Sequence, residues 1–371
     1  MSKPLRILLC GCGGIVDAHL PAFKAYPEKF VLAGICDPSA AARAGVLEAY
    51  GKAVPEFEAH EPMFAKLAAQ ADAALIVTPH FLHHPQAVAA LQSGLPCLIE
   101  KPITNNLAEA RALHALSQEK GLIVMAGQTR RYNSWARYLR DWVGADAVNF
   151  GQLSSFSIEA WQNILCWIAT KPDKNADFWI LDKERAGGGV VGSLGCHTLD
   201  LVRYLTGDDY AEVSAQGVFE KPFKNGAESA CCATLKMKSG AVGTLHANYL
   251  ARRVPYSETF KLYGTRGSIV QHSAAWGKYE GEVRYGSTTD DNPPGWEFQY
   301  EGLGPVPKVD LPGYRDNPFT NQLLEFHRCV TEGREPLTSV GRNLNTMAVI
   351  EAIFTSMIAG GATVNVEEAA S

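Results

Sequence analysis

The sequence of 371 residues has no long apolar run, since none of its hydrophobic stretches approaches the roughly eighteen residues that a membrane-spanning helix needs. It has no cluster of lysine and arginine either, and its formal net charge is −5. A surface without concentrated positive charge argues against binding to nucleic acid or to an anionic membrane. We therefore expect no membrane and no nucleic-acid partner, and a small uncharged or mildly polar ligand instead.

The nine cysteines follow no regular framework, and none of their spacings is that of a zinc site. Most of them lie within apolar stretches, where a thiol serves as a small hydrophobic side chain. Their odd number and scattered positions are typical of a protein in a reducing compartment. The sequence therefore predicts a cytoplasmic protein that holds no metal.

A chain of this length favours two domains over one. Within residues 1–126, short apolar stretches alternate with helical ones, and the strand candidates lie at residues 5–10, 30–36, 73–78, 97–99 and 122–126. Strands separated by helices of this length form a parallel sheet that is covered on both faces. We expect a doubly wound α/β domain over residues 1–126.

After residue 127 the pattern changes to alternating strand segments, some joined by tight turns as in antiparallel hairpins. One helix interrupts them at residues 198–205, and two more are expected near the end of the chain. The polar, Gly- and Pro-rich residues from about 273 to 317 predict an irregular lid, arm or subunit contact. Residues 127–371 are therefore predicted to be a second domain, for substrate binding and oligomerisation.

The stretch LLCGCGGIVDAHLPAF, residues 8–23, joins a predicted strand to a predicted helix through a glycine-rich loop. Gly11 permits a tight turn, and Gly13 lets the backbone approach a pyrophosphate that the amides at the helix start then hold. Val16 stands where a third glycine is usual, which affects helix packing rather than the anion site. The stretch predicts a dinucleotide site, the alternative being a glycine turn in an unrelated α/β protein.

Asp37 follows the next predicted strand, at the distance where dinucleotide-binding domains place an acidic residue. A carboxylate there binds a ribose 2′-hydroxyl and repels a 2′-phosphate, so NAD is favoured over NADP as the cofactor. From the loop and this carboxylate, we expect the cofactor to be bound by Gly11, Gly13, Gly14, Ile15 and Asp37.

Lys101 follows a strand of the same predicted sheet, and Thr78 and Pro79 follow the strand before it. Ligands bind at the carboxyl ends of such strands, where a lysine can donate to a substrate hydroxyl and stabilise a developing alkoxide. The alternative is a surface lysine that pairs with Glu100.

The stretch AGGGVVGSLGCHTLD places His197 at the start of a predicted helix and Asp200 one turn later on the same face. A histidine there is a candidate general base or acid for a hydroxyl and carbonyl pair, and Asp200 is a candidate to orient its imidazole. The alternative is a histidine with a purely structural role.

Together these stretches resemble the glucose-fructose oxidoreductase/inositol dehydrogenase/MocA (Gfo/Idh/MocA) family over nearly the whole chain. The similar motifs are the glycine loop with His19, TPHFLH at residues 78–83, EKP at 100–102, RYN at 131–133 and the glycine-rich residues 187–200. The resemblance implies a Rossmann domain followed by an α/β domain with a large, mostly antiparallel open sheet. It also implies NAD(P)-linked oxidoreduction of a sugar or polyol by a homodimer or homotetramer.

The motifs assign roles residue by residue. At the cofactor, the resemblance adds Thr78, Pro79, His80, His83, Glu100, Lys101 and Arg131. The motifs provide four candidates for substrate binding, which are Lys101, Tyr132, Ser193 and His197. Two further candidates, Trp161 and Asn248, lie near predicted strand ends.

Two motif positions differ from the family pattern. His80 replaces an asparagine, and Ser193 replaces an aspartate that usually grips the reacting hydroxyls together with the histidine. A serine can still bond a hydroxyl but carries no charge.

The leading hypothesis is NAD-dependent oxidation of a secondary hydroxyl of a sugar, glycoside or cyclitol, or the reverse reduction. His197 serves as the general base or acid, and Lys101 stabilises the reacting oxygen. Two alternatives remain open: a redox-assisted glycosidase or elimination enzyme that retains NAD, and a catalytically silent NAD-sensing regulator.

Overall fold

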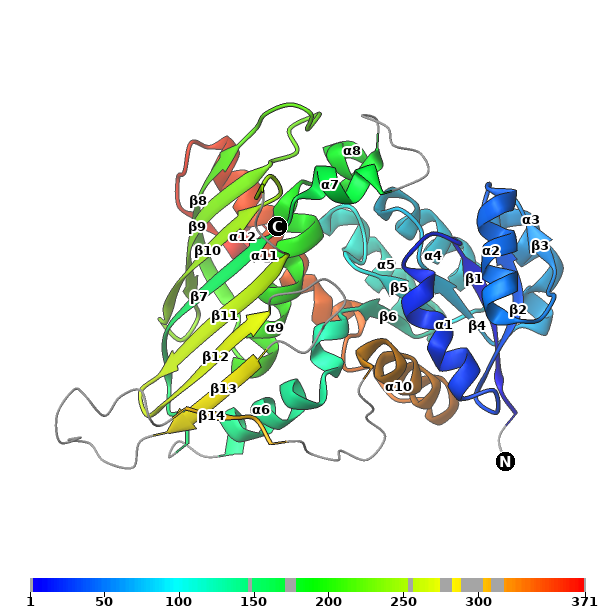
Figure 1. Cartoon of the computed structure of the whole chain (residues 1–371), viewed down its shortest axis with the longest axis horizontal. Helices are drawn as coiled ribbons and strands as arrows, with labels where there is room; N and C mark the ends of the chain where they lie inside the picture. Colours follow the sequence, from blue (N-terminus) through cyan, green and yellow to red (C-terminus); the bar gives the residue numbers. More distant parts are fainter. Residues whose placement is uncertain are drawn as a thin grey trace. The chain divides into compact units, whose positions relative to one another are not determined.

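The computed structural model describes residues 3–145, 149–170, 178–252, 256–273, 282–287, 303–307 and 317–369. The chain divides into two compact units (Figure 1). Unit 1 contains Met1–Thr129 and Phe319–Leu344, and unit 2 contains Arg130–Pro318 and Asn345–Ser371. The expected boundary after residue 126 lies near the first of these divisions, but the return of residues 319–344 to unit 1 was not predicted.

Unit 1 is built on a six-stranded parallel sheet with the strand order β3-β2-β1-β4-β5-β6. The strands are β1 Leu5–Cys10, β2 Phe30–Cys36, β3 Glu56–Phe57, β4 Ala73–Ile76, β5 Cys97–Glu100 and β6 Val124–Gly127. Every residue of β4, β5 and β6 is buried, as expected of strands covered on both faces. The strand order reverses between β1 and β4, which is where such sheets bind ligands.

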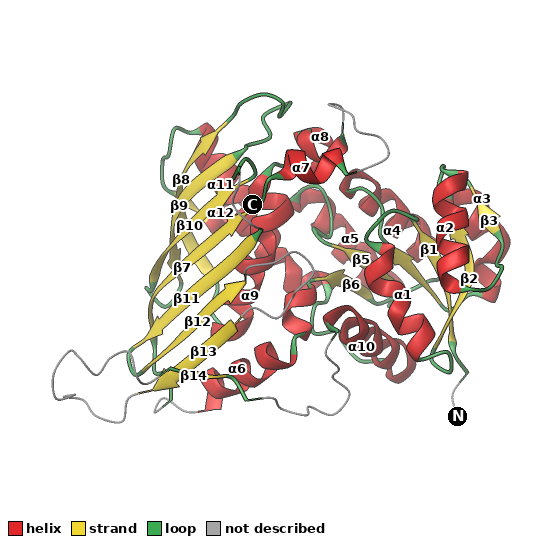
Figure 2. Ribbon diagram, viewed as in Figure 1, coloured by secondary structure: helices red, strands yellow, loops and turns green. Residues whose placement is uncertain are grey.

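The helices of unit 1 form two groups: α1 contacts α2, whereas α3 contacts α4 and α4 contacts α5. Their bounds are α1 Val16–Ala25, α2 Ala40–Tyr50, α3 His60–Leu67, α4 His83–Gln92 and α5 Leu107–Lys120 (Figure 2). Local capping starts two of them, because the Ser39 hydroxyl accepts from the Ala42 amide and Asn106 accepts from the Glu109 amide. The predicted α/β domain is therefore confirmed.

The returning segment of unit 1 contacts its sheet at two places, one at β2 and one at the edge strand β6. Helix α10, Pro318–Glu332, places the ring of His327 edge-on against Phe30. Beyond it, the Thr338 hydroxyl donates to the Ala126 carbonyl at 2.7 Å, and the Ala126 amide donates to the Thr338 carbonyl at 2.7 Å. These bonds satisfy backbone groups of β6 that an edge strand leaves unpaired.

Unit 2 contains a nine-stranded sheet with the order β14-β13-β12-β11-β7-β10-β9-β8-β15. All described neighbours are antiparallel except β7 and β10, which run parallel. The strands are β7 Leu153–Trp161, β8 Tyr210–Val218, β9 Ala230–Met237, β10 Val242–Asn248, β11 Ser257–Gly264, β12 Gly267–Ser273, β13 Glu282–Ser287, β14 Gly304–Pro305 and β15 Val364–Asn365. The expected mostly antiparallel sheet is confirmed.

The prediction of irregular structure from about 273 to 317 was wrong in part, because β13 and β14 lie within it. The inward-facing Tyr285 of β13 packs against Tyr138 and Trp142 of helix α6, Ser134–Ala145, and this packing favours a strand where the local sequence does not. Most of the remaining segment, expected as a lid or arm, lies outside the described residues.

One face of the sheet in unit 2 carries helices. The helical residues Val191–Gly195 (a π-helical turn, η5) run directly into α9, Cys196–Thr206, and both contact β7. Residues alternate along β7 between buried and partly exposed, so Ile158 and Ala160 face this helical layer and their neighbours face away from it.

The other helices of unit 2 are α7 Ile164–Ala169, α8 Lys183–Ala186 and α12 Val366–Ala369, while α11, Val340–Ile358, belongs to unit 2 from Asn345 onward (Figure 2). Across the described ranges, no helix combines the length and apolarity needed to cross a bilayer.

Candidate active site

The glycine loop directly follows β1 and has the geometry of a phosphate-binding turn. Gly11 has a φ of +95°, and a Cβ there would lie 3.0 Å from the Val77 carbonyl group, so other residues do not fit. A Cβ on Gly13 would meet nothing within 4 Å, which leaves the backbone open on that side. The residues present therefore fit a group that approaches the main chain closely, such as a pyrophosphate.

Asp37 lies just beyond β2 and ties that strand end to the glycine loop. One of its carboxylate oxygens accepts from the Cys12 amide at 2.9 Å, and the other accepts from the Ser39 amide at 2.8 Å. The carboxylate thus stands beside the loop at the carboxyl edge of the sheet, where a ribose hydroxyl is bound in dinucleotide sites.

His83 connects the loops that follow β4 and β5. Its two ring nitrogens lie 2.8 Å from the carbonyl oxygens of Thr78 and Pro102, and the ring is fully buried. Burial lowers the pKa of His83. Among the predicted cofactor residues, Thr78 also donates from its hydroxyl to Gln86 at 2.8 Å, and His80 is buried on the short turn that leads into α4. His83 therefore braces this edge from within, and its predicted contact with cofactor stays a prediction.

Lys101 follows β5 directly and is held through its backbone by Glu100. One oxygen of Glu100 lies 2.9 Å from Nε2 of His19, and the other accepts from the Lys101 amide at 3.2 Å. Burial by itself raises the pKa of Glu100, but the hydrogen bond from His19 and the nearby charges bring that pKa below its usual value. A charged, buried carboxylate thus fixes the start of the Lys101 loop, whose bond to Pro102 is cis.

Arg131 and Asp200 form a buried ion pair in unit 2. The Asp200 carboxylate accepts from Nε and Nη2 of Arg131 at 2.6 and 2.7 Å, and from the Thr346 hydroxyl at 2.8 Å. Burial alone lowers the pKa of Arg131, yet the Asp200 charge raises it above its usual value. Asp200 therefore pairs with Arg131 and Thr346, and its predicted role in orienting His197 stays a prediction.

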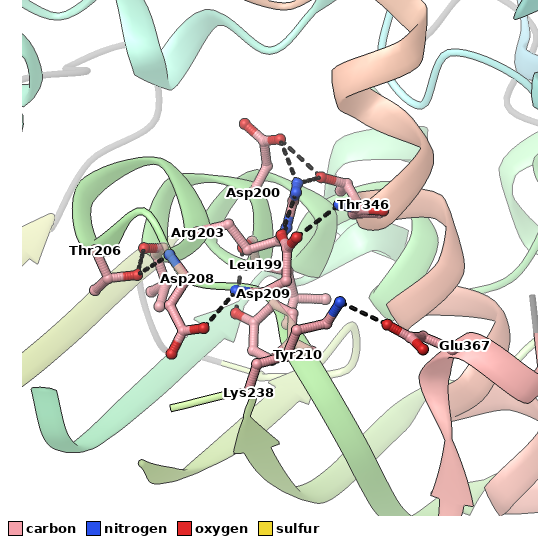
Figure 3. A network of polar contacts seen from close by, with 12 residues as sticks. Leu199, Asp200, Arg203, Thr206, Asp208, Asp209, Tyr210, Lys238, Thr346 and Glu367 are labelled. Atoms are coloured by element: carbon pink, nitrogen blue, oxygen red, sulfur yellow. Dashed lines mark hydrogen bonds and ion pairs between the residues drawn. The ribbon is translucent and has the colours of Figure 1, made fainter. Parts of the chain in front are cut away.

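The same network anchors α9 to two other parts of unit 2, as the view of Asp200, Arg203 and Thr346 in Figure 3 shows. Arg203 donates to the Thr346 hydroxyl at 2.8 Å and to the Asp209 carboxylate at 2.7 Å. The Tyr210 hydroxyl donates to the Leu199 carbonyl at 3.2 Å. The helix that carries His197 is thus fixed along its length by charged and polar contacts.

Ser193 and His197 lie on consecutive turns of this continuous helix, Ser193 on η5 and His197 on α9, and both are buried. The Ser193 side chain lies beside the Tyr249 hydroxyl, and burial raises the pKa of Tyr249 far above its usual range. Tyr249 is fully buried and directly follows β10, so it faces the helical layer. Sequence analysis did not assign Tyr249 to the site, although the alternation along LHANYL places it on the same face as Leu245.

Trp161 and Asn248 are paired in register at the ends of β7 and β10. Their neighbours Ala160 and Ala247 are buried toward the helices, so both side chains belong to the opposite face of the sheet from Ser193. Trp161 packs edge-on against His246 with ring centroids 5.4 Å apart. The structure therefore does not bring these two substrate candidates together with Ser193. Tyr132, another substrate candidate, is buried in the turn that carries Arg131.

Glu228 is a further buried carboxylate that sequence analysis missed. It lies just before β9, is fully buried, and accepts from the Gly189 and Val191 amides at 2.8 Å each. Burial raises the pKa of Glu228 to about 7 against the pull of these bonds and of the Lys183 charge. Its signal was weak, since one glutamate in GAESACC resembles a turn residue.

Metal ligands are not gathered in the part of the chain that the structure describes: no three His, Cys, Asp or Glu side chains there are placed to hold an ion.

These features define an oxidoreductase with an NAD-binding Rossmann domain. The model for the NAD-binding Rossmann fold of the Gfo/Idh/MocA oxidoreductases matches residues 5–128, and the model for the C-terminal domain of the same family matches residues 146–270. The chain belongs to the Gfo/Idh/MocA family.

Named relatives are similar over most of the chain. Levoglucosan dehydrogenase of Pseudarthrobacter phenanthrenivorans is 25% identical over 95% of this chain and 96% of its own length. UDP-N-acetylglucosamine 3-dehydrogenase of Acidithiobacillus ferrooxidans is 32% identical over 65% of this chain and 67% of its own. A solved structure of levoglucosan dehydrogenase with NADH and levoglucosan has a TM-score of 0.80 at 21% identity, over 98% of this chain and 100% of that chain. That last likeness shows a shared fold.

We predict that Gly11→Ala weakens NAD binding at least tenfold, because the added Cβ meets the Val77 backbone and displaces the loop. Gly94→Ala is the matched control, since Gly94 has a φ of +79° but a Cβ there would meet nothing within 4 Å. Both variants should lose about 1 kcal/mol of unfolding free energy from backbone strain. Titration with the cofactor, followed by fluorescence, measures the affinity of each variant. Equal NAD affinities in the two variants would contradict the assignment of the glycine loop as the pyrophosphate site.

We also predict a pH-dependent contribution of Glu228 to stability. Its folded-state pKa is raised from 4.5 to about 7, so between these pH values the folded chain keeps a proton that the unfolded chain releases. The free energy of unfolding therefore falls as pH rises from about 4.5 to about 7, by about 3 kcal/mol at about 1.4 kcal/mol per pH unit. Urea unfolding at pH 5, 6, 7 and 8 measures the free energy of unfolding of the wild type and of Glu228→Gln. If the free energies of the two proteins depended on pH in the same way, the prediction would be refuted.

Proposed function

We propose that this chain is an NAD-dependent dehydrogenase that oxidises a secondary hydroxyl of a sugar, glycoside or cyclitol, or carries out the reverse reduction. The observation that carries the proposal is the carboxyl edge of the sheet in unit 1, where an open glycine loop, the Asp37 carboxylate and the Lys101 loop follow neighbouring strands. The named relatives, a levoglucosan dehydrogenase and a UDP-N-acetylglucosamine 3-dehydrogenase, support the substrate class.

When bound, NAD supplies the acceptor for the hydride that leaves the carbinol carbon. Gly13, Gly14 and Ile15 would hold its pyrophosphate with main-chain amides, and Asp37 would bind a ribose hydroxyl. Gly11 would serve the tight turn beneath it, because the Gly11 amide donates to the Cys36 carbonyl at 2.8 Å. The carboxylate repels an added phosphate on that ribose, which supports NAD over NADP.

His197 accepts the proton of the substrate hydroxyl in this proposal, and the ion pairs that anchor its helix fix the position of its backbone. The Lys101 ammonium stabilises the oxygen as it gains negative charge, which lowers the pKa of the hydroxyl. Ser193 and Tyr249 present neutral hydroxyl groups and no carboxylate, which suits hydrogen bonding to an uncharged polyol.

The test is NADH absorbance with the purified chain and NAD across a panel of sugars, glycosides, cyclitols and sugar acids. Sustained formation of NADH with one of these compounds is the expected result. A rise that stops at one equivalent of protein would instead identify the enzyme type that retains NAD. Confirmed NAD binding without turnover of any compound would contradict the proposal and favour a silent regulator.

We predict that Lys101→Ala lowers kcat/KM at least 100-fold for the active sugar and leaves the NAD dissociation constant within threefold, because Lys101 acts on the reacting oxygen. The control is Lys120→Ala, which should retain wild-type kinetics. Lys120 is a partly exposed lysine beside Glu119 at the end of α5. Stopped-flow absorbance gives the rate of NADH formation. Wild-type turnover by Lys101→Ala would remove this residue from the chemistry.

A further inference from the structure

Glu228 binds three successive amides at the start of the helix that carries Ser193 and His197. Its carboxylate accepts from Gly189 and Val191 at 2.8 Å each, and its own carbonyl accepts from Val190 at 3.2 Å. The first amides of a helix have no partner within the helix, and negative charge is favourable at that end. Glu228 is therefore a cap delivered from a distant part of the chain.

The glycine-rich segment before this helix is shaped for the contact. A Cβ on Gly189 would overlap the carbonyl group of Glu228, so only glycine lets the two backbones approach this closely. The three glycines at residues 187–189 thus include one whose role is explained by Glu228 rather than by a ligand.

The contact leads to the hydroxyl pair of the site by two short routes. The Ser193 amide donates to the carbonyl of Gly189 at 3.2 Å, and Gly189 is held by the Glu228 carboxylate. The Tyr249 amide donates to the carbonyl of Ser229 at 2.7 Å, and Ser229 is the next residue after Glu228. The backbones of the neighbouring residues Ser193 and Tyr249 are therefore both held by the corner formed by Glu228 and Ser229.

We propose that Glu228 is a positioning residue for the dehydrogenase reaction: it fixes the helical turn that presents Ser193 and His197, and with Ser229 it sets Tyr249 against Ser193. This proposal rests on the proposed function for its kinetic consequence, while the structural part concerns unit 2 alone. Because NAD is assigned to the loops of unit 1, loss of Glu228 should affect the substrate step and leave cofactor affinity unchanged.

The experiment compares Glu228→Gln and Glu228→Ala with Val213→Ala at pH 8, where the wild-type carboxylate is ionised. Glutamine keeps one acceptor oxygen and turns an NH₂ group toward the second amide, whereas alanine removes both acceptors. Val213 is buried on β8, opposite Leu235 and Val364, and its truncation is a control for general loss of core packing. Thermal unfolding establishes how much stability each variant has lost.

The expected kinetic result is a graded loss of kcat/KM for the sugar, at least tenfold in Glu228→Gln and larger in Glu228→Ala. The NAD dissociation constant should stay within twofold throughout, and Val213→Ala should keep kcat/KM within twofold at a similar loss of Tm. Unchanged kcat/KM in Glu228→Gln, or an equal loss in Val213→Ala, would overturn the proposal.

Amide hydrogen exchange of the peptide spanning residues 189–197 gives a readout that needs no substrate. Exchange there should be at least tenfold faster in Glu228→Gln than in the wild type and unchanged in Val213→Ala. If the wild type oxidised no sugar in the panel, the proposed function would fail, and exchange alone would decide whether Glu228 holds this turn. Equal exchange in the wild type and Glu228→Gln would overturn that role.

Discussion

The Asp200 carboxylate is almost completely removed from water, and much of unit 2 is arranged to keep it paired. Its partners Arg131 and Thr346 lie 69 and 146 residues away in sequence. Leaving one member of such a pair uncompensated typically costs about 3–5 kcal/mol, so the three segments have to meet for the unit to be stable. The consequence is a helix α9 whose position, and with it that of His197, is determined by electrostatics as well as by apolar packing.

Unit 1 solves a related problem at the carboxyl edge of a parallel sheet, where chain segments must turn sharply and still satisfy their polar groups. Buried side chains of the unit do this from within: Glu100 binds His19 and the amide of Lys101, and His83 lies between the carbonyls of Thr78 and Pro102. Such internal bonds hold the loops in place before any ligand arrives, which reduces the ordering that binding requires.

The two units thus share a design in which a buried carboxylate or imidazole fixes the backbone beside a candidate functional side chain. Glu100 does so for Lys101, Asp200 for α9 and Glu228 for the turn before Ser193. In each case the acidic group is itself buried, where a polar group needs a hydrogen-bond partner from the protein. Membership of the Gfo/Idh/MocA family supplies the NAD-binding frame, and Ser193 is a position at which this chain departs from the pattern of the family's motif.

The sequence by itself determined the features that depend on neighbouring residues. The alternation of strands and helices, the cap at Ser39, the glycine loop and the positions of Asp37 and Lys101 just beyond their strands follow from local periodicity and turn chemistry. Only the tertiary structure decided the pairing of Asp200 with Arg131, the capping by Glu228, the return of residues 319–344 and the face on which Trp161 and Asn248 lie. The reason is that burial makes a charged group bind whichever partner the fold brings near, and that partner can stand anywhere along the chain.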